Sequence, residues 1–105
     1  MLSIRFDGDR EWWVSGEIFD RLFAEGLRRG LIRPGLAAVQ HVANANGGLD
    51  VGLLDAKQGA ELTTAIRSAA HQEATRLGSM ALDADDQSYL AGIARLLEVI
   101  PQQRE

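Results

Sequence analysis

The sequence predicts an α+β protein that is mainly helical, with an N-terminal two-stranded antiparallel hairpin followed by about four helices. Apolar and polar residues alternate over the first positions, and helical spacing of apolar residues dominates after Ser15. A chain of 105 residues has room for one hydrophobic core. We therefore expect a single domain over residues 1–105, with a hairpin at about 2–15 and helices at about 16–29, 35–46, 56–77 and 84–100.

The predicted hairpin rests on strand periodicity. Every second residue from Leu2 to Phe6 is apolar, which is typical of a strand with one buried face. A second short strand is expected over 11–15, after turn residues at 7–10. A three-residue loop would keep the apolar side chains of both strands on one face, whereas a two-residue turn at 8–9 would mix them with polar ones. The expected partners are Phe6 with Trp12, Ile4 with Val14, and Arg5 with Trp13.

Residues that start and stop helices delimit the four predicted helices. Ser15, Asp55 and Asp83 are expected N-caps, because their side chains accept hydrogen bonds from the first free backbone amides. Gly30 is positioned to end the first helix, and Pro101 the last. The apolar residues at 49–54 are expected to form a connector between the second and third helices.

Composition narrows the functional classes. The formal net charge is −4 and cysteine is absent, which removes disulfides, thiol nucleophiles and thiolate metal sites. Neither a long apolar run nor a signal-peptide pattern is present, so we expect a cytoplasmic protein without a membrane partner. Lys57 is the one lysine beside ten arginines, which favours a GC-rich bacterial source.

Histidine chemistry has two candidates, His41 and His71. Each points away from the apolar stripe of its predicted helix, so both are expected at the surface. No paired-histidine, calcium-loop, phosphate-loop or Gly-x-Ser-x-Gly pattern occurs. No metal and no cofactor are therefore expected.

Glu73 is the unusual carboxylate, because the helical wheel places it inside the apolar stripe of the third helix. A buried carboxylate needs a partner, and Arg76, Tyr89 and Arg95 are the candidates. The favoured interpretation is a structural ion pair at the edge of the core. The alternative is an acid in a pocket between the third and fourth helices.

One basic cluster is present, and it contains Arg28, Arg29 and Arg33. Arginine near the end of a helix also interacts favourably with the last carbonyls and the helix dipole. With an acidic net charge, a nucleic-acid partner is not expected, although a continuous positive stripe through these arginines would reveal one.

The adjacent tryptophans carry the strongest signal for binding. Neighbouring strand residues point to opposite faces, so Trp12 and Trp13 cannot both pack on the Phe6 side. If Trp12 is buried, Trp13 lies outside near Arg5, where it either anchors a protein interface or packs internally under other groups.

These observations favour a small, non-enzymatic protein that binds another protein chain, identical or different, through Trp13 and Arg5. An inhibitor or an immunity-type partner is one such role. The sequence leaves enzyme activity open, and the alternative function is a small enzyme or ligand-binding protein that uses Glu73.

Overall fold

The computed structural model describes residues 1–101. Its elements are β1 (Leu2–Asp7), β2 (Arg10–Val14), α1 (Gly16–Arg28), η1 (Pro34–Leu36), α2 (Ala37–Asn46), β3 (Gly48–Asp50), η2 (Val51–Leu53), α3 (Ala56–Gly78) and α4 (Ala84–Val99), where η marks a short 3₁₀ helix. The mainly helical α+β class and the four predicted helices are confirmed.

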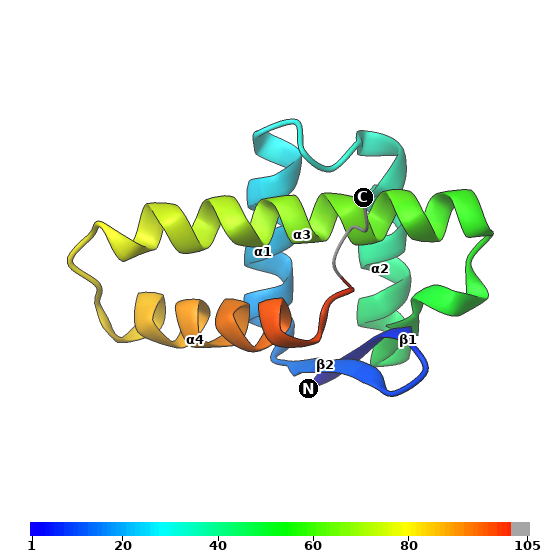
Figure 1. Cartoon of the computed structure of the whole chain (residues 1–105), viewed down its shortest axis with the longest axis horizontal. Coiled ribbons are helices and arrows are strands. Elements are labelled where there is room, and N and C mark those ends of the chain that lie inside the picture. The colour runs from blue at the N-terminus through cyan, green and yellow to red at the C-terminus, as the bar shows by residue number, and fades with distance from the viewer. Residues whose placement is uncertain (102–105) are drawn as a thin grey trace.

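The helices form a crossed arrangement on one side of a small sheet. In Figure 1, α3 spans the molecule, α4 runs antiparallel below it, and α1 crosses behind α3 and packs on it. The sheet lies along the lower side of the view, where β2 runs beside the C-terminal half of α4. This packing places one face of the sheet against the helices.

The predicted helix caps are present. Ser15 Oγ accepts a hydrogen bond from the Ile18 amide at 3.2 Å, and Asp55 accepts one from Lys57 at 2.9 Å. Asp83 accepts one from Asp86 at 2.8 Å. These three side chains fix where α1, α3 and α4 begin.

The sheet has three strands, so the expectation of a two-stranded hairpin is corrected. β1 pairs antiparallel with β2 and parallel with β3, in the order β2-β1-β3. Part of the expected connector at 49–54 is therefore strand. Gly48 allows this pairing, because a Cβ atom there would lie 2.4 Å from the Ser3 carbonyl oxygen.

The register of the hairpin also differs from the prediction. Trp12 pairs with Ile4, and Trp13 pairs with Ser3, two positions away from the expected partners. The turn has two residues, with Gly8 at φ +43°, and a bulge at Phe6 adds one residue to β1. A two-residue turn alone would place apolar residues of one strand beside polar residues of the other. The extra residue at the bulge shifts β1 by one position, so the apolar side chains of both strands still share one face.

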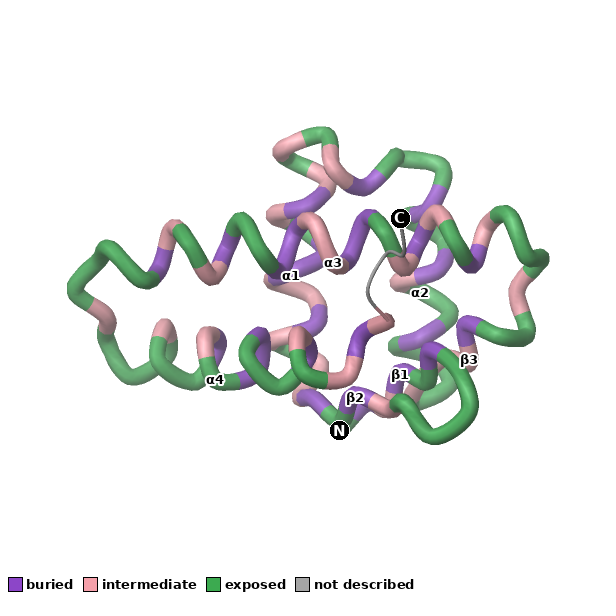
Figure 2. Tube along the Cα trace, viewed as in Figure 1, coloured by how far each residue is buried: buried purple, intermediate pink, exposed green. Residues whose placement is uncertain are grey.

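The core lies between this face of the sheet and the helices. Figure 2 shows buried positions on the sides of the elements that face one another. The largest fully buried side chains include Ile4, Trp12, Phe19, Phe23, Leu62, Ile93 and Leu96. Within residues 1–101, no helix is both long and apolar enough to cross a membrane.

Candidate protein-binding face

The two tryptophans occupy opposite environments, as strand parity requires. The Trp12 side chain is 1% exposed, and its indole Nε1 donates a hydrogen bond of 3.0 Å to the carbonyl oxygen of Gly92 in α4. Trp13 is 55% exposed and lies on the other face of the sheet. The Trp12 indole is therefore packed and hydrogen-bonded in the core, whereas the Trp13 indole remains accessible to a partner.

The polar side chains near Trp13 are already paired with one another. Ser3 Oγ donates to Glu11 Oε1 at 2.7 Å, and Arg5 Nη2 lies 3.3 Å from the same oxygen. The Ser3 hydroxyl, followed by the Arg5 guanidinium, holds the pKa of Glu11 below its usual range. Arg5 is opposite Glu11 and not opposite Trp13, so the expected Arg5–Trp13 pair is corrected by the register.

A shallow recess of about 190 Å³ runs between β2 and the end of α4. Glu11, Trp12 and Trp13 line its strand side, and Arg95, Glu98 and Val99 line its helix side. Arg95 and Glu98 are exposed and form no ion pair within residues 1–101. Arg95 was expected as a possible partner of Glu73, but it lies at this recess instead.

Glu73 is a structural ion-pair centre. It is 1% exposed, and its carboxylate contacts Arg76 Nη2 at 2.7 Å and Arg29 Nη2 at 2.9 Å. Arg76 was an expected partner, whereas Arg29 was not. Arg29 also lies 3.4 Å from Glu25, so this cluster joins the end of α1 to α3. A buried carboxylate held by two guanidinium groups satisfies the pairing that its burial demands.

Tyr89 completes the surroundings of Glu73 from α4. Burial, followed by the neighbouring Glu73 carboxylate, raises the pKa of the Tyr89 phenol. Its hydroxyl is buried and has no hydrogen-bond partner within residues 1–101. The Arg21 guanidinium lies 4.0 Å from the centre of the Tyr89 ring and also pairs with Asp86 at 2.8 Å. A groove of about 350 Å³ borders Arg21 and Tyr89, but Glu73 does not line it.

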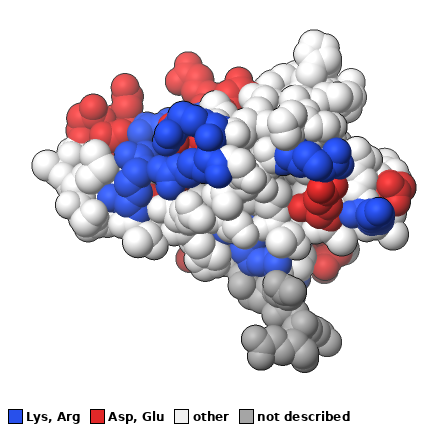
Figure 3. Space-filling view, turned by 90° about the horizontal axis from the view of Figure 1, so that it is seen from above, with Lys and Arg blue, Asp and Glu red and all other residues white. Residues whose placement is uncertain are grey.

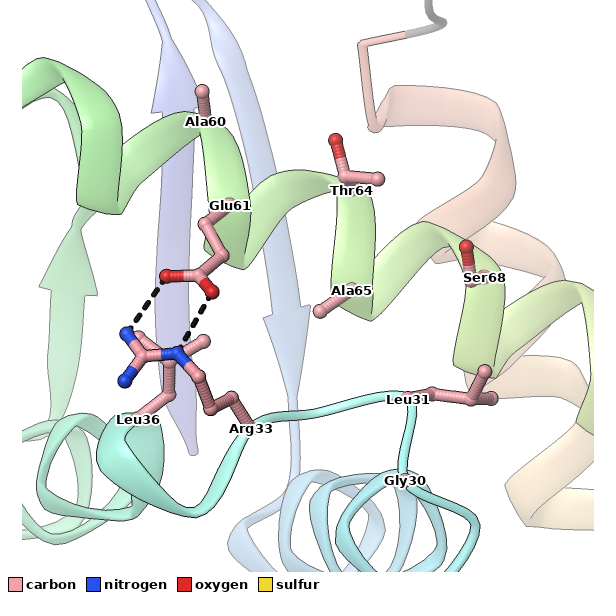
Figure 4. A pocket seen from close by; sticks show the side chains of 9 residues that line it. All are labelled: Gly30, Leu31, Arg33, Leu36, Ala60, Glu61, Thr64, Ala65 and Ser68. Carbon is pink, nitrogen blue, oxygen red and sulfur yellow. Dashed lines mark hydrogen bonds and ion pairs between the residues drawn. The ribbon is translucent and has the colours of Figure 1, made fainter.

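The larger grooves do not reach Glu73 itself, although one of about 350 Å³ is lined by its partners Arg29 and Arg76. The groove in Figure 4 has a volume of about 520 Å³ and lies between α3 and the segment from Gly30 to Leu36. Arg33 and Glu61 face each other across one end of it, with two nitrogen–oxygen distances of 2.9 Å. Glu73 lines none of the five grooves identified over residues 1–101.

Each arginine of the basic cluster is paired with at least one carboxylate. Arg28 pairs with Glu25 at 2.6 Å, Arg29 with Glu25 and Glu73, and Arg33 with Glu61. In Figure 3, one larger basic patch on the left is separated by uncharged side chains from smaller basic groups, of which those on the right lie beside acidic side chains. The continuous positive stripe that would indicate a nucleic-acid partner is not seen on this face.

His41 and His71 are both exposed, as expected. Within residues 1–101, no three His, Asp or Glu side chains are grouped closely enough to hold a metal ion. Comparisons with family models, curated proteins and solved structures gave no match.

Proposed function

We propose that the chain is a non-enzymatic protein-binding module whose contact surface is the outer face of the sheet, centred on Trp13 with Arg5 at its margin. The observation that carries the proposal is the 55% exposure of Trp13 on an edge strand, whereas the neighbouring Trp12 is buried in the core. Exposed tryptophan and arginine are the residue types most enriched among the residues that dominate binding energy in protein interfaces.

The surroundings of Trp13 support a contact surface in a second way. Glu11 holds Ser3 and Arg5 in place, so the polar groups at the margin are ordered before a partner arrives. Preordered side chains lose less conformational entropy when a complex forms. An inhibitor or immunity-type role is compatible with a small acidic protein of this kind.

The alternative function, an enzyme or ligand-binding protein that uses Glu73, receives no support from the geometry. Its carboxylate contacts two arginines and lines none of the grooves over residues 1–101. A general acid needs access to its substrate, and this arrangement offers none. We therefore propose only the binding function.

Capture from a lysate of the source cells tests the proposal. The full chain, Trp13→Ala and the control Val42→Ala are immobilised separately, and the retained proteins are compared by mass spectrometry. Val42 is an apolar residue on α2 with 44% exposure, so it matches Trp13 as an exposed apolar side chain elsewhere. We expect the Trp13 variant alone to lose retained protein. Equal capture by all three chains would reject the proposed surface.

A further inference from the structure

The outer edge of β2 is free to pair with another strand. β2 lies at one edge of the sheet, and within residues 1–101 it accepts no backbone hydrogen bond from outside its ladder with β1. With five residues it is the longer edge, because β3 has three. A row of unpaired backbone groups on an edge strand is a template for strand addition.

The charges beside this edge indicate which molecule supplies the added strand. Arg95 and Glu98 lie three residues apart on α4, border the recess beside Trp13, and have no ion-pair partner within residues 1–101. The recess thus presents one free positive and one free negative charge. A twofold axis beside such a surface can place each charge opposite the opposite charge of a second copy.

We propose that a second copy of this chain occupies the edge, with the two β2 strands paired antiparallel about a twofold axis. Such an axis, perpendicular to the sheet, joins the two sheets into one and keeps the helices of both copies on the same side. Because α4 lies beside β2, the two α4 ends then face each other in opposite directions. Arg95 of each copy meets Glu98 of the other.

The same pairing covers the apolar part of the edge. Trp13 of both copies lies on the outer face of the joined sheet, next to the seam, and the recess between β2 and α4 is closed by the neighbouring copy. This inference rests on the proposed binding function and names its partner. It concerns the β2 edge, whereas the proposed function requires only that Trp13 contact some protein.

Charge reversal tests the pairing, with oligomeric state measured by sedimentation velocity on the full chain. Arg95→Glu leaves four acidic side chains at the seam, and Glu98→Arg leaves four basic ones. Each single variant is expected to weaken the dimer about tenfold or more, as like charges facing each other do. Lys57→Glu, which makes the same charge change at an exposed site on α3, is the control and is expected to dimerise normally.

Restoration identifies the partner as a second copy. The double variant with Arg95→Glu and Glu98→Arg regains both ion pairs and is expected to dimerise like the original chain. An equimolar mixture of the two single variants is expected to form a heterodimer, because one copy then supplies both acids and the other both bases. A foreign partner of fixed charge could not produce either result.

Two outcomes would overturn the inference. One is an original chain that remains monomeric at concentrations up to about 0.5 mM, where even weak dimers form. The other is a dimer that Arg95→Glu and Trp13→Ala leave unchanged. If the chain is monomeric but Trp13→Ala still abolishes capture of a foreign protein, the second-copy inference fails and the binding function stands. If neither Arg95→Glu nor Trp13→Ala changes dimerisation, and capture does not depend on Trp13, both fail.

Discussion

The two faces of the sheet differ in almost every respect although they share the same strands. On the inner face, Trp12 is covered by α4, its indole is hydrogen-bonded, and Ile4 and Val14 beside it are fully buried. On the outer face, Trp13 is more than half exposed, and Glu11 accepts hydrogen bonds from the side chains of Ser3 and Arg5. Of two adjacent residues of one strand, Trp12 therefore packs in the core and Trp13 faces solvent.

The difference teaches how a small chain can separate stability from recognition. An apolar side chain in the core contributes about 25 cal/mol for each Å² that folding removes from water. An equivalent side chain left outside contributes that free energy only when a partner covers it. Strand alternation assigns the two tasks to neighbouring positions, and each can be changed without directly changing the other.

Replacing Trp12 gives the largest expected effect and would break the inner face. Trp12→Ala removes a fully buried indole and should lower the free energy of unfolding by about 3 to 5 kcal/mol. Trp12→Phe keeps most of the apolar contact but loses the bond to Gly92, and should cost about 1 kcal/mol. Urea denaturation measures both. A Trp12→Ala chain as stable as the original would show that the inner face is not the stabilising one.

Glu73 extends the comparison to a buried polar group. Glu73→Ala leaves Arg29 and Arg76 without their shared carboxylate and should lower the free energy of unfolding by roughly 1 to 3 kcal/mol. Glu17→Ala removes an exposed carboxylate of α1 that has no ion-pair partner within residues 1–101 and lies outside the proposed seam, so it serves as the control. Urea midpoints compare the two. Equal midpoints would mean that the Glu73 ion pairs contribute no stability.

The outer face should respond to pH through Glu11. Its lowered pKa means that the contribution of this carboxylate is present above the ordinary glutamate pKa and is lost as pH falls through the lowered value. Carboxyl NMR titration should therefore give Glu11 a midpoint below the ordinary glutamate value. Ser3→Ala should raise the midpoint, because the Ser3 hydroxyl is the largest cause of the shift. No change in that variant would reject the hydrogen bond.

The histidines provide the smallest expected effect. Both side chains are exposed and lie away from the two faces of the sheet. The double change of His41→Gln and His71→Gln should alter the free energy of unfolding by under about 1 kcal/mol and leave partner capture intact. Thermal melts and capture assays check this. Loss of capture would place the contact surface on the helices.

Local patterns were sufficient to predict the helices and the two faces of the hairpin. Ser15, Asp55 and Asp83 act on amides two or three residues away, so a cap is visible in the sequence itself. Alternation likewise placed Trp12 and Trp13 on opposite faces, but it left open whether Trp13 is exposed or covered. The burial of Glu73 followed from its position on the helical wheel.

Features that depend on distant contacts were missed. The third strand has three residues and exists because Gly48 lies against Ser3, which no local pattern reveals. The bulge at Phe6 shifted the register while leaving the buried face unchanged, so alternation could not detect it. Arg29 reaches Glu73 from another helix, and Trp12 bonds to a residue 80 positions away. Such pairings follow from tertiary packing.

The most direct test of the division between the faces is ¹⁹F NMR of the chain labelled with 5-fluorotryptophan. The sequence contains two tryptophans, so two signals are expected, and Trp13→Phe assigns them. In dilute solution the Trp13 signal should shift between H₂O and D₂O, whereas the Trp12 signal should not. When a partner binds or the chain self-associates, the Trp13 signal should move and lose this solvent dependence while Trp12 stays unchanged. A Trp13 signal that keeps its position and solvent sensitivity in the complex would contradict the account.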